Sequence, residues 1–108
     1  MTTLNHVLGA IADPTRRSIL ARLADGPARI SDVAAPFPMS LTGFCKHVRI
    51  LEHAGLVKRA RHGRENTLAL SARPLQLVAE WVLNYEQFWD LRMDRLDKYF
   101  AAKKEVPR

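Results

Sequence analysis

The stretch of residues 40–55, SLTGFCKHVRILEHAG, most constrains what this chain can fold into. Its apolar residues recur at spacings of three, four and three, which places them on one face of a helix: they are Leu41, Phe44, Val48 and Leu51. Ser40 can cap the first turn through its hydroxyl, and Gly55 can supply a left-handed stop. The opposite face is centred on Lys46. Because a helix that reads the DNA major groove is apolar on one side and rich in donors on the other, we expect residues 40–54 to form a recognition helix.

Length and charge limit the class of protein. The 108 residues are enough for one small domain with a modest core, so we expect a single domain over residues 1–108. Lys and Arg number 17 against 11 acidic residues, a formal net charge of +6. This excess favours a polyanionic partner, because each neutralised phosphate releases a counterion, although a merely basic surface would have the same composition.

Cysteine usage and hydropathy indicate a cytoplasmic protein with no membrane segment. The single cysteine, Cys45, excludes a disulfide within the chain. No segment approaches the ~20 consecutive apolar residues that a membrane span needs, and the N-terminus lacks the features of a signal peptide.

The chain before the recognition helix predicts three shorter helices. Residues 3–12 carry a narrow apolar stripe and form the first. Asp13 and Pro14 then end it and begin a second helix over residues 14–25, because aspartate can cap a helix and proline suits its first position. A short third helix at about residues 30–35 leads through a tight turn into the recognition helix. Two helices joined in this way, the second with a basic outer face, form the helix-turn-helix pattern.

After Gly55 the pattern changes from helical to extended. Two short runs on either side of a glycine-containing turn predict a β-hairpin, or wing, over residues 56–71. Residues 74–103 then predict one long helix with an apolar stripe too wide for a domain of this size to cover, which marks an interface. The expected fold is therefore mainly α with a small β-hairpin: a winged helix-turn-helix of four helices, two strands and a last helix. We expect it to dimerise through the first helix and the long last helix.

The candidate DNA contacts lie on the recognition helix, on the wing and at the start of the second helix. They are Arg16, Arg17, Ser40, Thr42, Gly43, Lys46, His47, Arg49, Arg59, Arg61, His62 and Arg64. Lys46 and Arg49 could simply be a solvated helix face, but the neighbouring turn and wing favour contact with DNA. We expect the wing arginines to touch the backbone or minor groove rather than to read sequence. His47, at the edge of the apolar face, either bonds a phosphate or satisfies a turn.

Arg16 and Arg17 occupy an unfavourable place near the N-terminus of the second helix, where the helix dipole disfavours cations. A phosphate or an acidic neighbour would offset this. We expect one of the two to contact a phosphate and the other to pair with an acidic residue of the chain, and the sequence does not decide which does which.

Two runs of sequence resemble the ArsR/SmtB family of bacterial winged-helix repressors. Residues 11–20, IADPTRRSIL, are similar to the run that opens the second helix of that family. Residues 39–51, MSLTGFCKHVRIL, and the AGLV at 54–57 are similar to its recognition helix and the beginning of its wing. The resemblance covers essentially residues 4–100. It implies a homodimeric repressor that binds an inverted-repeat operator in double-stranded DNA, often controls its own operon and is released by an inducer.

The resemblance also allows the metal sites of the family to be checked. The arsenic-type site uses paired cysteines at the start of the third helix, where residues 29–33 of this chain read RISDV and contain no thiol. The zinc-type site uses histidine and carboxylate ligands on the C-terminal helix, and residues 74–103 contain no histidine. Since such metals prefer imidazole or thiolate, we expect no metal and no other cofactor, and an inducer that is not a metal.

The expected dimer interface combines the first helix with the aromatic last helix. Its residues are Leu4, Val7, Leu8, Ile11, Trp81, Tyr85, Phe88, Trp89 and Leu96. The aromatic cluster could instead hold a small apolar inducer. Cys45 stands where the family usually has serine or threonine, and it is either a half-buried small residue or a sensor thiol near a helix N-terminus. The alternative function is thus a redox- or ligand-sensing dimer, acting through Cys45 or the aromatic cluster on a protein partner.

An enzyme is not expected. Cys45 and His47 lie two apart on one helix and point in divergent directions, so they cannot form a nucleophile–base pair.

Overall fold

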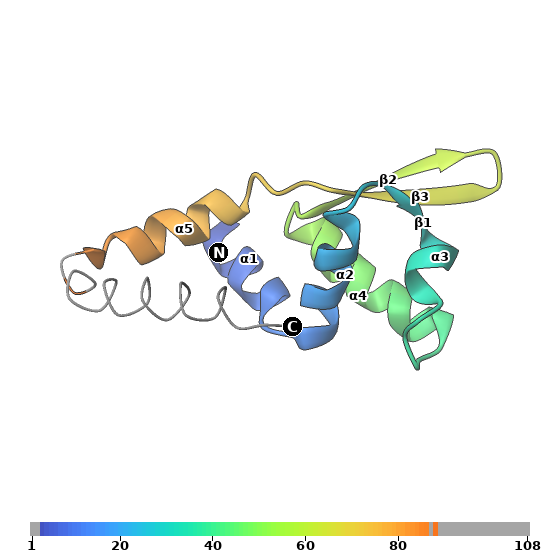
Figure 1. Cartoon of the computed structure of the whole chain (residues 1–108), viewed down its shortest axis with the longest axis horizontal. Helices are drawn as coiled ribbons and strands as arrows, with labels where there is room; N and C mark the ends of the chain where they lie inside the picture. The colour runs from blue at the N-terminus through green and yellow to red at the C-terminus, as the bar shows by residue number, and fades with distance from the viewer. Residues whose placement is uncertain (1–2, 87, 89–108) are drawn as a thin grey trace, which may run out of the picture. The chain divides into compact units, whose positions relative to one another are not determined.

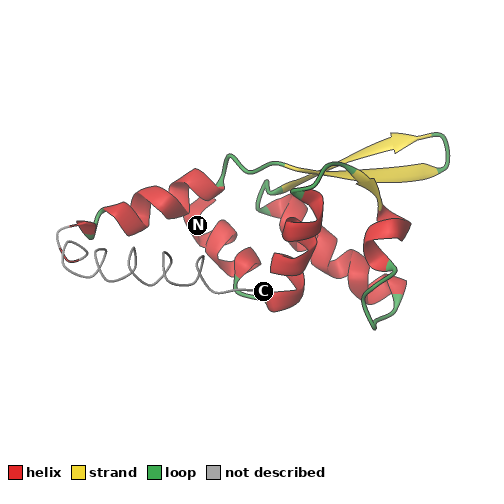
Figure 2. Cartoon of the chain, viewed as in Figure 1, coloured by secondary structure: helices red, strands yellow, loops and turns green. Residues whose placement is uncertain are grey.

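The computed structural model describes residues 3–86 and residue 88, and it contains the winged helix-turn-helix that the sequence predicts (Figure 1, Figure 2). The elements follow in the order α1 Thr3–Ile11, α2 Pro14–Leu23, β1 Ala28–Arg29, α3 Ile30–Ala34, α4 Leu41–His53, β2 Val57–His62, β3 Glu65–Leu70 and α5 Leu75–Leu83. The chain divides into two compact units, residues 1–78 and residues 79–108, and each is described by itself.

The boundaries of α2 and α4 follow from the capping residues in the sequence. Asp13 precedes α2, and its carboxylate accepts the backbone N–H of Arg16 at 3.1 Å, while Pro14 occupies the first turn. Ser40 precedes α4, and its Oγ accepts the backbone N–H of Gly43 at 3.1 Å. Each cap satisfies an amide that the helix itself leaves without a partner.

The core of the first unit gathers apolar side chains from the helices and the sheet. Its buried members are Val7, Ala10, Ile19, Leu20, Leu23, Val33, Phe44, Val48, Leu51, Ala54, Leu56, Val57 and Leu68. Phe44, Val48 and Leu51 are fully enclosed, as the spacing in α4 predicts. The prediction for Leu41 is wrong: its residue surface is 60% exposed, because it opens α4 one turn before Phe44 reaches the core. The ring of Phe37, in the turn before α4, lies 5.5 Å from that of Phe44 and closes the core there.

The wing is an antiparallel hairpin of β2 and β3 that extends away from the helices (Figure 1). The pairing runs to His62 opposite Glu65, so Gly63 and Arg64 alone form the turn. Gly63 has φ +64°, a left-handed conformation that a two-residue hairpin turn requires and that glycine adopts without strain.

A third strand, which the sequence pattern does not predict, joins the sheet beside β3. β1 pairs antiparallel with it, Ala28 opposite Leu68 and Arg29 opposite Thr67, giving the strand order β1-β3-β2. Two residues show no alternation from which a strand could be recognised. The strand matters because a two-stranded hairpin is marginal by itself, and β1 fixes its base directly before α3.

The helix predicted over residues 74–103 is interrupted after residue 83. α5 begins at Leu75, whose side chain packs against the core together with Val78, and ends at Leu83; the part of the predicted helix beyond residue 88 lies outside the described residues. The N–H of Asn84 is shared between the carbonyls of residues 80 and 81, at 3.1 and 3.3 Å, and the N–H of Tyr85 bonds to residue 82. This tightening to three-residue spacing is typical of a helix end, and asparagine is a poor residue for a helix interior. In the part of the chain that the structure describes, no helix is long and apolar enough to cross a membrane.

Three aromatic side chains of the second unit form an exposed row. Trp81 and Tyr85 contact edge to face with ring centroids 5.8 Å apart, and Tyr85 and Phe88 are 6.3 Å apart. All three are exposed, with Phe88 at 66%. Trp89 and Leu96, which we also expect at the dimer interface, lie outside the described residues.

Candidate nucleic-acid interface

The outer face of α4 presents the side chains that we expect to meet DNA. Lys46 and Arg49 are exposed, and among the described residues neither has a hydrogen bond or an ion pair. Thr42, one turn earlier, is exposed too. A Cβ on Gly43 would meet Ser40 Oγ at 3.3 Å, so the cap itself favours a residue without a side chain here. The N-terminal half of this face is therefore narrow, and Lys46 and Arg49, which have no partner among the described residues, follow it along the helix.

The tip of the wing is also cationic and exposed. Arg61 donates from Nε to the carbonyl of Gly63 at 3.0 Å, which folds this side chain over the turn. His62 and Arg64 have no hydrogen-bond or charged partner within the described part of the chain. Arg61, His62 and Arg64 lie in or beside the turn that joins β2 and β3.

Arg59 differs from the other wing arginines because it is already paired. Its Nη2 donates to Glu52 Oε1 of α4 at 2.9 Å, and each side chain is 31% exposed. The pair joins the wing to the recognition helix. Glu52 cannot be identified from the sequence, since no helical or strand period relates two residues on different elements.

A second set of ion pairs joins the wing to α3. Arg29 donates to Asp32 at 2.9 Å and to Glu65, the first residue of β3, at 3.2 Å. The hydrogen bonds from Arg29 to Asp32 and then Glu65 hold the pKa of Arg29 above its ordinary value. The side chains are about half exposed, so each pair contributes little to stability, but together they fix the start of α3 relative to the wing.

Arg16 and Arg17 cap the end of α1. Arg16 donates from Nε to the carbonyl of Ala10 at 2.7 Å and from Nη2 to that of Gly9 at 3.2 Å. Arg17 donates from Nη1 to the carbonyl of Ile11 at 2.7 Å. The last carbonyls of a helix lack partners and carry the negative end of its dipole, so they offset the unfavourable position at the start of α2. The expected ion pair with an acidic residue is wrong: among the described residues neither guanidinium bonds to a carboxylate. A phosphate contact of either arginine stays a prediction.

His47 faces inward from α4 to the start of α2. Its Nδ1 lies 3.1 Å from Arg16 Nη1 and 3.9 Å from Asp13 Oδ2, and its side chain is 24% exposed. Because a guanidinium can only donate, a hydrogen bond between these two atoms requires an accepting Nδ1, which the neutral ring with its proton on Nε2 provides. The backbone N–H of Arg16, which donates to the Asp13 carboxylate, holds the pKa of Asp13 below its ordinary value, and the positive charge of Arg16 acts in the same direction. His47 is thus an internal contact between two helices rather than the partner of a turn.

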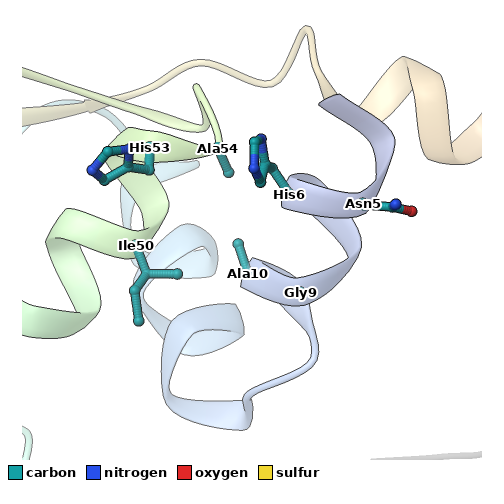
Figure 3. A pocket seen from close by; sticks show the side chains of 7 residues that line it. All are labelled: Asn5, His6, Gly9, Ala10, Ile50, His53 and Ala54. Atoms are coloured by element: carbon teal, nitrogen blue, oxygen red, sulfur yellow. The ribbon is translucent and has the colours of Figure 1, made fainter. Parts of the chain in front are cut away.

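A hollow of about 300 Å³ lies between α1 and α4 (Figure 3). It is lined by Asn5, His6, Gly9, Ala10, Ile50, His53 and Ala54. Figure 3 shows Ala10 and Ile50 pointing toward one another across it, whereas Asn5 points away. Gly9 and Ala10 are also the residues whose carbonyls bind Arg16, so the wall of the hollow and the Arg16 contact share one segment of α1. No three histidine, cysteine, aspartate or glutamate side chains in the described ranges come together as metal ligands.

The residues expected at the dimer interface fall into two groups. The prediction that Val7 lies at the dimer interface is wrong, because Val7 has no exposed surface in the single chain and belongs to the core. Leu4, Leu8 and Ile11 are half-buried on α1.

Cys45, the expected alternative sensor, is a half-buried free thiol on α4.

Comparison with known proteins gives a consistent result. Residues 11–60 match a family model described as a helix-turn-helix domain. The chain is 35% identical over 82 residues to the transcriptional repressor SdpR of Bacillus subtilis strain 168, covering 76% of this chain and 91% of that protein. It is 42% identical over 80 residues to the HTH-type transcriptional regulator Rv2034 of Mycobacterium tuberculosis, covering 74% and 72%. A crystal structure of an ArsR family transcriptional regulator superposes with a TM-score of 0.76 at 40% identity, covering 82% of this chain and 91% of that chain.

Proposed function

This chain belongs to the ArsR/SmtB family of winged-helix transcriptional regulators, which bind DNA and are not enzymes, and on that premise we propose that it is a homodimeric repressor of an inverted-repeat operator. The observation that carries the proposal is the division of α4 into two faces. Phe44, Val48 and Leu51 are fully buried, while Lys46 and Arg49 on the other side are exposed without partners among the described residues. The core therefore holds this helix while its donors stay available.

In this proposal α4 enters the major groove with its narrow end leading. Ser40, Thr42 and Gly43 allow the helix to approach closely, and the hydroxyls can donate to phosphate or base edges. Lys46, near the middle, is placed to donate to O6 and N7 of guanine, the commonest specific contact in that groove. Arg49 follows on the same side and contacts a base or a phosphate.

The wing supplies affinity rather than sequence discrimination. Arg61, His62 and Arg64 at its tip lie against the DNA backbone or minor groove, where they release counterions but distinguish bases poorly. Arg59 is neutralised by Glu52 and contributes less than its charge suggests.

A second copy of the chain completes the operator-binding unit. The exposed row of Trp81, Tyr85 and Phe88 supports this, because a protein that stays monomeric rarely leaves such an apolar strip uncovered. The two-fold axis of the dimer then sets half-sites about one helical turn apart. We further propose that the repressor controls its own operon and that an inducer other than a metal releases it.

Selection of DNA from a random pool, followed by binding measurements, tests the proposal. The wild-type protein should enrich a palindromic sequence. Lys46→Ala should then lower the ratio of operator to non-specific affinity by roughly 5- to 150-fold, the cost of losing one good base contact.

The matched control removes the same charge from another exposed site. Lys58→Ala on β2 should weaken both complexes alike and leave the ratio unchanged, because β2 belongs to the wing. A pool that yields no palindrome, or a Lys46→Ala protein with the wild-type ratio, would contradict the proposed function.

A further inference from the structure

One side chain connects three helices beside the proposed reading surface. Arg16, in the first turn of α2, bonds to the carbonyls of Gly9 and Ala10 at the end of α1, at 3.2 and 2.7 Å. Its remaining nitrogen, Nη1, lies 3.1 Å from Nδ1 of His47 on α4. The position of the recognition helix relative to α1 is therefore held partly through one imidazole.

From this geometry we infer that His47 is a proton-sensitive positioning residue: neutral, it ties α4 to Arg16, and protonated, it releases α4 and weakens operator binding. The inference rests on the proposed function as an operator-binding repressor. It assigns His47 an internal role instead of a direct contact with phosphate.

The chemistry of the contact makes it depend on one proton. In the neutral ring, Nδ1 has a lone pair that accepts the Arg16 N–H. When solvent supplies a proton to Nδ1, both partners become donors and two positive charges face each other at 3.1 Å. Arg16 keeps its two carbonyl partners on α1, so the bond that breaks is the one to α4.

No other described side chain lies within hydrogen-bond distance of Nδ1. Asp13 Oδ2 is the nearest carboxylate oxygen, at 3.9 Å; its charge attracts a protonated ring, but at that distance it does not form the hydrogen bond that ties α4 in place. Arg17 bonds to the carbonyl of Ile11. On α1 the only titratable side chain is His6, which lines the hollow. Lys46 precedes His47 in α4 but lies on the exposed face.

The sign of the pH effect separates this inference from simple charge effects. Protonating any histidine adds positive charge, which strengthens binding to a polyanion through counterion release. The Arg16–His47 contact predicts the opposite, weaker binding in acid. A phosphate contact by His47 would also strengthen binding in acid, so the direction alone distinguishes the two roles.

The test measures operator affinity by fluorescence anisotropy at fixed salt, at pH about 7.5 and about 5.5, which span the range where histidine usually changes charge. The wild-type protein should lose roughly tenfold in affinity on acidification, within the usual size of a coupling between sites. His47→Asn keeps an acceptor oxygen near the position of Nδ1 but has no proton to gain, so it should lose nothing. His62→Asn, a matched change at the wing tip, should lose at least as much as the wild type, because it removes a histidine whose protonation strengthens binding.

A measurement without DNA keeps the inference separate from the proposed function. The ¹⁵N shifts of the His47 ring should show the Nε2–H tautomer at neutral pH. Acidification should shift the amide signals around residue 47 in the wild type but not in His47→Asn, whereas signals beside His53, at the end of α4, should shift in both. A ring protonated on Nδ1 at neutral pH, or a wild-type affinity that is unchanged or rises in acid, would overturn the inference without contradicting the proposed repressor function. Failure to bind any operator at neutral pH would overturn the proposed function, whatever the ring shows.

Discussion

The ion pair between Arg59 and Glu52 makes a quantitative prediction about DNA binding. Arg59 lies on β2, but its guanidinium is held 2.9 Å from the Glu52 carboxylate. Replacing Glu52 with glutamine removes the negative charge and frees Arg59 for a phosphate. We therefore expect Glu52→Gln to bind DNA more tightly than the wild type.

The size of the effect follows from counterion release. Each additional neutralised phosphate steepens the dependence of log affinity on log salt by about 0.9. Between about 200 and 50 mM salt, the ratio of the Glu52→Gln affinity to the wild-type affinity should grow by about 3.5-fold. The salt concentration changes fourfold, and 4 to the power 0.9 is about 3.5. The cost in stability should be at most about 1 kcal/mol, because the pair is partly exposed and solvent screens it.

The assay is fluorescence anisotropy on a non-specific duplex at several salt concentrations, with urea denaturation to check stability. Arg59→Gln alone should leave the salt slope nearly unchanged, and the double variant should return to the wild-type slope. Asp25→Asn is the matched control, because it removes one negative charge from an exposed turn where the carboxylate has no partner among the described residues.

Two results would refute this reasoning. Arg59→Gln could flatten the slope by about 0.9, which would mean that Arg59 already contacts phosphate and leaves Glu52 on binding. Glu52→Gln and Asp25→Asn could also have equal slopes, which would mean that only net charge matters.

Two further predictions concern stability. Gly9→Ala should raise the free energy of unfolding, measured in urea, by about 0.5–1 kcal/mol, because a Cβ there meets nothing within 4 Å and alanine suits a helix. Gly43→Ala should show no such gain, because its Cβ would meet Ser40 Oγ at 3.3 Å. Equal changes in the two variants would contradict this reasoning. The pKa of Asp13 is lowered from 3.8 mainly by the Arg16 backbone N–H, so its contribution to stability is complete at neutral pH and is lost as pH falls through that lowered pKa. The difference in melting temperature between the wild type and Asp13→Ala should therefore disappear in strong acid, and a constant difference down to pH about 2 would be inconsistent with it.

The recognition helix could be predicted because several independent signals in the sequence agree. The apolar spacing, the Ser40 cap and the stop at Gly55 all point to the same boundaries, and the structure places α4 at Leu41–His53. Leu41 was misplaced because periodicity gives the direction of a side chain, not whether the core extends far enough to cover it. The end of α5 at Leu83 was missed for a related reason: its apolar stripe continues past the point where the backbone bonding changes.

The features that could not be predicted from the sequence involve the backbone or contacts between separate elements. Arg16 and Arg17 were recognised as unfavourably placed, but their partners are the carbonyls of residues 9–11, which every residue type has. The strand β1 likewise exists only because β3 offers it a hydrogen-bonding edge. The pairs Arg59–Glu52 and Arg29–Glu65 depend on how separate elements meet, and no local period encodes that.

The order of the sheet has a practical consequence for work on the wing. β2 is an edge strand of six residues, and its outer hydrogen-bonding groups have no strand beside them among the described residues. Cationic side chains on such an edge keep strands of different molecules from zipping together. We therefore expect Lys58, Arg59 and Arg61 to protect the protein against precipitation, separately from the DNA contacts proposed for the wing arginines. Variants that neutralise several of them to abolish DNA binding should be tested for aggregation first, since loss of soluble protein would look the same as loss of affinity.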